Sequence, residues 1–109
     1  MYFALNLFDL KNAALYRKYM EVAGPIVEND LGGKLICMGK LTDKVPIQFP
    51  GSTVGGGQQW MVIAMYLTED GPKQLWEHPK YQAVKELRDL GTSNFVWALY
   101  RQADVLTES

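Results

Sequence analysis

The sequence predicts an α+β domain with the ferredoxin-like element order β-α-β-β-α-β. Four strand-length apolar segments are separated by two segments with helical periodicity, and glycine or proline marks most boundaries. This order implies a four-stranded antiparallel sheet with the helices on one face, because right-handed crossovers place them there. The 109 residues fit one domain, spanning residues 1–109.

The first strand is expected over residues 2–8, which are mostly aromatic and aliphatic. Asp9 and Asn12 offer N-caps for the helix that follows. From Ala13, apolar residues recur at helical spacing and form a face wide enough to cover a sheet. Gly24-Pro25 predicts a kink or short break in this helix, and Gly32-Gly33 predicts its end. The apolar face consists of Leu15, Tyr19, Val22 and Ile26 with Tyr16, Met20, Ala23 and Val27.

The second strand is expected over residues 34–40, with Gly39 as a candidate bulge. Residues 41–59 are rich in proline and glycine and are predicted to form a long flexible loop. Its run of three glycines, residues 55–57, precedes a strand and lacks the lysine of a phosphate-binding loop, so a lid or disordered tip is expected. The third strand follows over residues 60–67.

The last third of the chain begins with a short helical turn at Asp70-Gly71-Pro72. A second helix is predicted from Pro79, with His78 as its cap and Gly91 at its end. The fourth strand is expected over residues 94–100, and residues 102–109 form a polar tail.

Both faces of the predicted sheet are apolar, although helices cover only one of them. Burying one such side chain contributes about 1.5–3 kcal/mol, so a wholly exposed apolar face is unfavourable. We therefore expect a homodimer that packs sheet to sheet about a two-fold axis. The alternative is a monomer whose long loop folds under the sheet. Within each strand the two opposing sets are both apolar: Phe3, Leu5 and Leu7 against Tyr2, Ala4 and Phe8; Met61, Ile63, Met65 and Leu67 against Trp60, Val62, Ala64 and Tyr66; and Phe95, Trp97 and Leu99 against Val96, Ala98 and Tyr100.

Composition excludes several classes of partner. The net charge is −1, and the eleven basic and twelve acidic residues are not segregated, so no nucleic-acid surface is expected. Apolar runs are strand-length, so no membrane span is expected, and no signal peptide is recognised. Cys37 is the single cysteine, which excludes a disulfide within the chain and favours a cytoplasmic protein; a small core residue is the expected role for it.

The chain resembles the DUF1330 group of the dimeric α+β barrel superfamily. The most specific similarity is the segment from Leu75 to Tyr81, which contains Trp76 and Pro79; the other matching positions are Tyr16, Tyr19, Gly24-Pro25, Gly32-Gly33, Trp60, Val62 to Leu67 and Leu87-Arg88. Two departures are His78, where that family usually has serine, and Met38-Gly39-Lys40, where it commonly has Arg-Gly-Gly. The resemblance implies a dimeric α+β barrel. The superfamily includes cofactor-free monooxygenases, polyketide cyclases, lactone isomerases, haem-degrading enzymes and proteins without a known reaction.

His78 is the single histidine and the candidate general base, because imidazole titrates near neutral pH and a helix N-terminus favours its neutral form. Some plant-type cyclases of the superfamily carry a similar His-Pro pair in which histidine is the base. The alternative is a solvent-facing cap. Tyr81, Tyr66, Tyr16 and Tyr19 are candidates to orient a ligand or donate to an oxyanion, or they are core residues.

Three further sets of residues have open roles. Asn6 is polar in an apolar strand and would bind a ligand, the backbone or a second subunit. Trp60, Trp76 and Trp97 would line a flat apolar pocket or fill the core or interface. Arg88 would pair with a surface carboxylate or bind an acidic ligand.

The hypothesis is a small-molecule-binding protein whose ligand is a small apolar, aromatic or polyketide-like compound. It would be a cofactor-independent enzyme of cyclase, isomerase or monooxygenase type, with His78 as base, Tyr81 in the catalytic site, and Asn6, Tyr16, Tyr19, Tyr66 and Trp76 as ligand-binding residues. The alternative is a non-catalytic dimeric binding or accessory protein. Neither a metal nor a cofactor is expected, since one His, one Cys and scattered carboxylates give no ligand spacing; haem, which needs one axial histidine, stays open.

Overall fold

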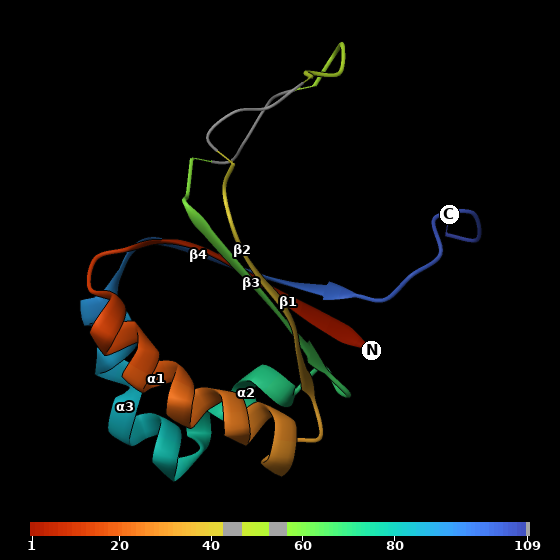
Figure 1. Cartoon of the computed structure of the whole chain (residues 1–109). Helices are drawn as coiled ribbons and strands as arrows, with labels where there is room; N and C mark the ends of the chain where they lie inside the picture. Colours follow the sequence, from red (N-terminus) through yellow and green to blue (C-terminus); the bar gives the residue numbers. More distant parts are fainter. Residues whose placement is uncertain (43–46, 53–56, 109) are drawn as a thin grey trace.

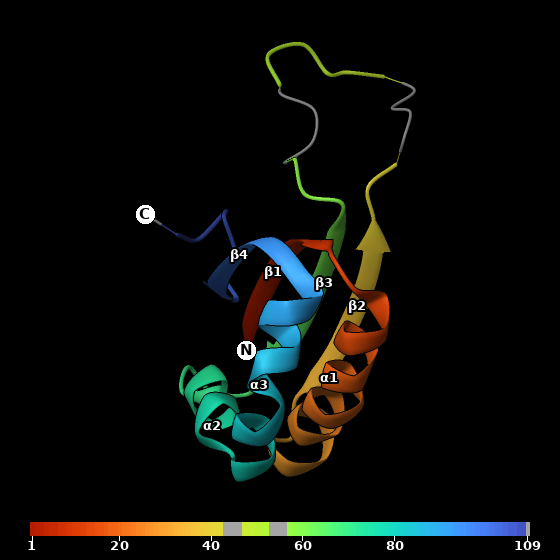
Figure 2. The ribbon, with the colours of Figure 1, turned by 90° about the vertical axis from the view of Figure 1, so that its left-hand side faces the viewer.

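The computed structural model describes residues 1–42, 47–52 and 57–108 and has the predicted α+β, ferredoxin-like fold. The four strands form one antiparallel sheet in the order β2-β3-β1-β4. The helices lie together on one face of this sheet (Figures 1 and 2). In chain order the elements are β1 (Tyr2–Leu10), α1 (Ala13–Pro25), η1 (Ile26–Asp30), β2 (Lys34–Lys40), β3 (Trp60–Tyr66), α2 (Gly71–Glu77), α3 (Pro79–Gly91) and β4 (Thr92–Arg101).

The first helix begins where the sequence predicts. The Asn12 side chain accepts a hydrogen bond from the Leu15 backbone N–H at 3.2 Å, so Asn12 is the cap. Pro25 does not interrupt the helix; α1 continues directly into η1, a π-helical segment. The Leu31 N–H donates to the Ile26 carbonyl, five residues back, so the hydrogen-bond spacing widens after the proline. Gly32 follows with a positive φ of 66°, as a helix end requires.

Three local predictions are wrong. The bulge in β2 lies between Leu35 and Cys37, whereas Gly39 pairs in regular register with Met61. Asp9 is not a helix cap, because it lies within β1 and accepts hydrogen bonds from the Gln59 backbone and the Asn94 side chain. Cys37 is exposed rather than buried, since β2 is an edge strand and the residue pairs with Ile63 on the uncovered face.

The core lies between the helices and the inner face of the sheet, which carries the buried side chains of Ala4, Phe8, Val62, Ala64 and Tyr66. The opposite, outer face is also apolar on β1, β3 and β4, as the strand alternation predicts. Strand register places Leu5 between Ile63 of β3 and Ala98 of β4 at the centre of this outer face. No helix in the described part of the chain covers it (Figure 1).

The segment 41–59 connects β2 to β3 at one end of the sheet. Its described residues form neither helix nor strand. Gly55 and Gly56 lie outside the described residues, so the predicted lid or disordered tip stays a prediction. None of the described helices has both the length and the apolar character needed to cross a membrane.

Candidate functional site

A cavity of about 320 Å³ lies between the helices and the inner face of the sheet. All four strands, together with α1, η1, α2 and α3, supply its walls, and most of its lining is apolar. Six of the seven predicted site residues line it: Asn6, Tyr16, Tyr19, Tyr66, Trp76 and Tyr81. These residues meet because side chains alternate across a strand and recur every 3.6 residues around a helix. The two periods direct them to the faces where the sheet and the helices are in contact.

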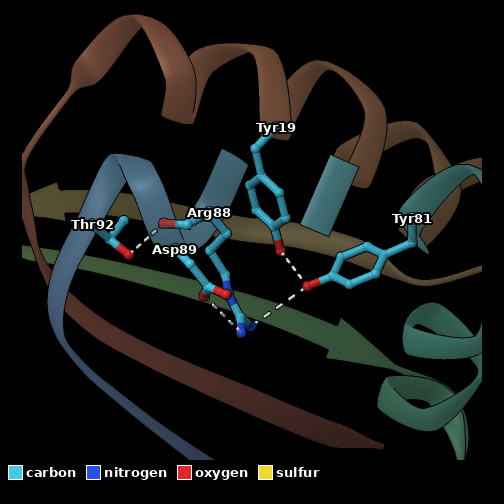
Figure 3. A network of polar contacts seen from close by, with 5 residues as sticks. All are labelled: Tyr19, Tyr81, Arg88, Asp89 and Thr92. Carbon is cyan, nitrogen blue, oxygen red and sulfur yellow. Dashed lines mark hydrogen bonds and ion pairs between the residues drawn. The ribbon is translucent and has the colours of Figure 1, made fainter. Parts of the chain in front are cut away.

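Two phenols form the polar centre of the cavity. The hydroxyl of Tyr19 on α1 lies 2.9 Å from that of Tyr81 on α3, and the two side chains point toward one another (Figure 3). Tyr19 is 7% exposed and Tyr81 2% exposed, so this hydrogen bond is buried. The Arg88 Nη1 donates to the Tyr81 hydroxyl at the longer distance of 3.5 Å. A pair of phenols is thereby linked to a guanidinium inside an otherwise apolar space.

Tyr16, Tyr19 and Tyr66 are neutral at physiological pH. Burial raises the pKa of Tyr16 to about 12 and that of Tyr66 to about 12. Burial also raises the pKa of Tyr19, and the nearby Tyr81 adds to the effect. A neutral phenol donates a hydrogen bond but does not remove a proton. These residues are therefore suited to stabilising negative charge on a bound molecule.

Asn6 lies on the inner face of β1 and lines the cavity. Its side-chain nitrogen donates to the Val62 carbonyl oxygen at 3.1 Å, which is the backbone contact weighed for it. This hydrogen bond uses one N–H donor of the Asn6 amide and fixes the orientation of the side chain. The same nitrogen also donates to the Ala4 carbonyl oxygen at 3.4 Å. The amide oxygen is then the part of the side chain that is available to a ligand.

His78 is the one predicted site residue that is not among those lining the cavity. It is the N-cap of α3, where its Nδ1 accepts from the Lys80 backbone N–H at 3.1 Å. Its Nε2 lies 2.9 Å from Asp30 Oδ2, which connects the end of η1 to the start of α3. Both ring nitrogens therefore have partners within the chain. The general-base role stays a prediction.

Arg88 also lines the cavity, although it is not one of the seven predicted site residues. It follows Tyr81 by seven residues, or two helical turns, and therefore lies on the same face of α3. Its guanidinium stacks over the Phe95 ring at 4.9 Å and also pairs with Asp89 at 3.5 Å. Both roles considered for Arg88 are therefore geometrically available: a surface ion pair and a position on the cavity wall.

The three tryptophans separate into two places. Trp76 and Trp97 line the cavity and are about half exposed, at 46% and 50%. Trp60 instead lines a second, apolar cavity of about 250 Å³ where segment 41–59 joins the sheet. Within the described ranges, no group of three or more His, Cys, Asp or Glu side chains is placed to hold a metal ion.

Comparison with known proteins supports the fold. No protein-family model matches the chain, and no curated protein matches it significantly. Solved structures do match. RPA0582 from Rhodopseudomonas palustris, a protein of unknown function, has a TM-score of 0.73 and 19% identity, covering 94% of this chain and 82% of that one.

Two further matches extend the comparison. SnoaB from Streptomyces nogalater, a cofactor-independent oxygenase, has a TM-score of 0.61 and 11% identity over 98% of this chain and 97% of its own. A dimeric ferredoxin-like protein of unknown function from Thermobifida fusca has a TM-score of 0.59 and 14% identity over 93% and 90%. At these identities the similarities show a shared ferredoxin-like fold, and the DUF1330 resemblance stays a prediction.

Proposed function

We propose that the protein binds a small apolar or aromatic molecule in the inner cavity. The observation that carries this proposal is the cavity itself. Its volume of about 320 Å³ falls within the range of ligand sites, roughly 300–1,000 Å³. Such sites are mostly apolar and contain a few polar groups that fix orientation, as Tyr19, Tyr81 and Arg88 would here.

The aromatic side chains of the lining favour a flat ligand. Trp76, Trp97 and Phe95 contribute ring faces or edges, and aromatic rings prefer stacked or edge-on contacts with other rings. A fused-ring or polyketide-like compound would satisfy these surfaces. The DUF1330-like membership predicted from the sequence is compatible with this proposal and assigns no substrate.

A cofactor-independent enzyme of cyclase, isomerase or monooxygenase type is the second candidate. The fold shared with SnoaB and the neutral phenols favour it, because phenols can stabilise an enolate without a cofactor. Among the described lining residues there is neither an imidazole nor a carboxylate. Binding is therefore better supported than catalysis, and His78 as base would require the ligand to approach the start of α3.

We also propose that the protein works as a homodimer through its outer sheet face. The face is apolar over β1, β3 and β4, and in the described chain no helix covers it. The similar Thermobifida fusca protein is dimeric. The molecule measures 17 Å along its shortest axis, which corresponds to one helix layer on one sheet, so a second copy would complete the burial.

Ligand binding is tested by filling the cavity. Ala64 lies on the cavity wall, so Ala64→Leu projects three extra carbon atoms into the space. Ala83 is exposed on α3, so Ala83→Leu is the matched control. The neutral probe is 2-naphthamide, followed by quenching of tryptophan fluorescence. We expect saturable binding in the wild type and in the control and at least about tenfold weaker binding in Ala64→Leu. Equal binding in all three proteins would refute the cavity as the site.

Dimerisation is tested by placing a charge on the outer face. Ile63→Glu introduces a carboxylate opposite Leu5, where the two-fold interface would leave it unpaired. Thr68→Glu places the same charge at an exposed position beyond β3. Sedimentation velocity should show a dimer for the wild type and for Thr68→Glu and a monomer for Ile63→Glu. A wild-type monomer at micromolar concentration would overturn this proposal.

A further inference from the structure

Arg88 is a cation in largely apolar surroundings. Its side chain is 27% exposed, its guanidinium packs on the Phe95 ring at 4.9 Å, and it lines the inner cavity. Taking a charge out of water is unfavourable unless partners replace the lost hydration. The partners of this guanidinium therefore indicate what it is suited to bind.

The described residues satisfy Arg88 only weakly. A guanidinium has five N–H donors. Here Nη1 makes one hydrogen bond, to Tyr81 at 3.5 Å, and Nη2 makes one ion pair, to Asp89 at 3.5 Å. Asp89 is 72% exposed, so solvent and salt screen that pair. Nε is buried and has no partner among the described residues. The fork geometry that normally engages a carboxylate in two parallel hydrogen bonds is left open.

The phenol pair adds a further donor at the same place. Tyr19 and Tyr81 carry two hydroxyl protons, and their mutual hydrogen bond at 2.9 Å uses only one of them. Whichever hydroxyl accepts this bond keeps its own proton free to donate. Figure 3 shows the guanidinium and both hydroxyls converging from α1 and α3. An oxygen atom at this point would receive donors from a cation and a phenol together.

The charges around the cavity favour an anion. Its described lining contains Arg88 and Lys73 and no Asp or Glu. Lys73 is largely exposed and lies 3.9 Å from Glu77, so Arg88 supplies most of the local positive potential. A single-sign charge in an apolar recess attracts the opposite charge.

We infer that the cavity selects ligands with an acidic oxygen, a carboxylate or an enolate, which Arg88 holds beside the Tyr19–Tyr81 pair. This inference rests on the proposed binding function and narrows its ligand class from aromatic molecules to aromatic acids and their vinylogous equivalents. The competing account is that Arg88 only packs α3 against Phe95 and pairs with Asp89.

The test compares two probes of nearly equal shape, 2-naphthoate and 2-naphthamide, at pH 7.5 in low salt. In the wild type, naphthoate should bind about tenfold or more tightly than the amide, since hydrogen bonds to a charged group are the stronger ones. Arg88→Met keeps an unbranched apolar stem over Phe95 and removes the charge. It should weaken naphthoate binding about tenfold or more and leave the amide within about twofold. Arg17→Met, at an exposed position on α1, is the matched control and should match the wild type.

Arg88→Lys is the second variant, in case Arg88→Met does not fold. A lysine keeps the charge without the fork, so it should retain a preference for naphthoate that is smaller than in the wild type. Equal affinities for the two probes in the wild type would overturn the inference, as would Arg88→Met weakening both probes equally. In either case naphthamide binding would still support the proposed function. If neither probe binds to the wild type, the proposed function fails and the inference fails with it.

Discussion

The hydrogen bond between Tyr19 and Tyr81 is a sensitive point of the cavity. Both hydroxyls are buried, and they lie 2.9 Å apart on two helices that are joined through this contact. Tyr19→Phe or Tyr81→Phe removes one hydroxyl and leaves the other without its partner. The double variant removes both hydroxyls and leaves no orphaned group.

The size of the effect follows from this asymmetry. A buried polar group that loses its partner costs about 1–3 kcal/mol, whereas removing both partners is nearly neutral. Each single variant should therefore lose about 1–3 kcal/mol of unfolding free energy. Tyr81→Phe should lose more, because Tyr81 also accepts from Arg88. The double variant should lose no more than the worse single variant, which gives a coupling energy of at least about 1 kcal/mol.

Urea unfolding at one fixed protein concentration measures these differences, because a dimer makes the midpoint depend on concentration. A second cycle, Tyr19→Phe with Tyr2→Phe, serves as the control. Tyr2 lies at the start of β1 and does not line the cavity, so this pair should be additive within about 0.5 kcal/mol. Additive losses for Tyr19 and Tyr81 would show that water or another group already satisfies the hydroxyls, and the reasoning would be wrong.

Three further predictions concern stability. The unfolding free energy should fall as pH rises from 10 to about 12, because Tyr16 and Tyr66 ionise near pH 10 when unfolded but only near 12 when folded; Tyr66→Phe should reduce this loss in urea titrations at stepped pH. Gly71→Ala places its Cβ in steric overlap with the Tyr66 ring and should cost about 1–3 kcal/mol. Gly24→Ala, whose Cβ meets its nearest atom at 3.4 Å, should stay within about 1 kcal/mol of the wild type; equal losses for the two would contradict the packing. His78→Ala should lose about 0.5–2 kcal/mol through its helix cap, whereas His78→Asn should retain most of the cap, so any turnover lost in His78→Asn would support the general-base role.

The fold could be predicted from sequence because its determinants are local. Residues 34–40 form a strand with the predicted bounds, and Asn12 and His78 are the caps that their positions indicate. The bulge near Leu35 could not be predicted, since it depends on the register between β2 and β3 rather than on either strand alone. The helix continues past Pro25 toward Gly32-Gly33 as predicted, but its π-helical form there could not be predicted. The sequence predicts a kink or short break, whereas packing of Ile26 and Val27 into the core favours a widened helix.

The residues of the candidate site also differ in how far the sequence alone could place them. Residues such as Tyr19 and Tyr66 belong to apolar faces that must meet, so periodicity placed them together correctly. A helix-capping residue need not belong to an apolar face, so periodicity does not indicate where its side chain points. His78 is directed by its hydrogen bonds to Lys80 and Asp30, and nothing in a His-Pro pair indicates on which side of α3 the ring lies. For Arg88 the sequence predicts either a surface ion pair or an acidic ligand, and its two-turn spacing from Tyr81 is the signal that the two residues share a face of α3.

The described cavity lining supplies hydrogen-bond donors and one well-placed cation, and it contains neither an imidazole nor a carboxylate. These described residues are suited to stabilising a negative charge rather than to removing a proton from a weak acid. A ligand that exploits them must therefore bring its own acidity, as a carboxylic acid or a readily ionised enol does. The same requirement would apply to catalysis: a reaction in this cavity would begin from an anion that forms before or during binding. Substrate acidity, rather than a protein base, would then decide which aromatic molecules react.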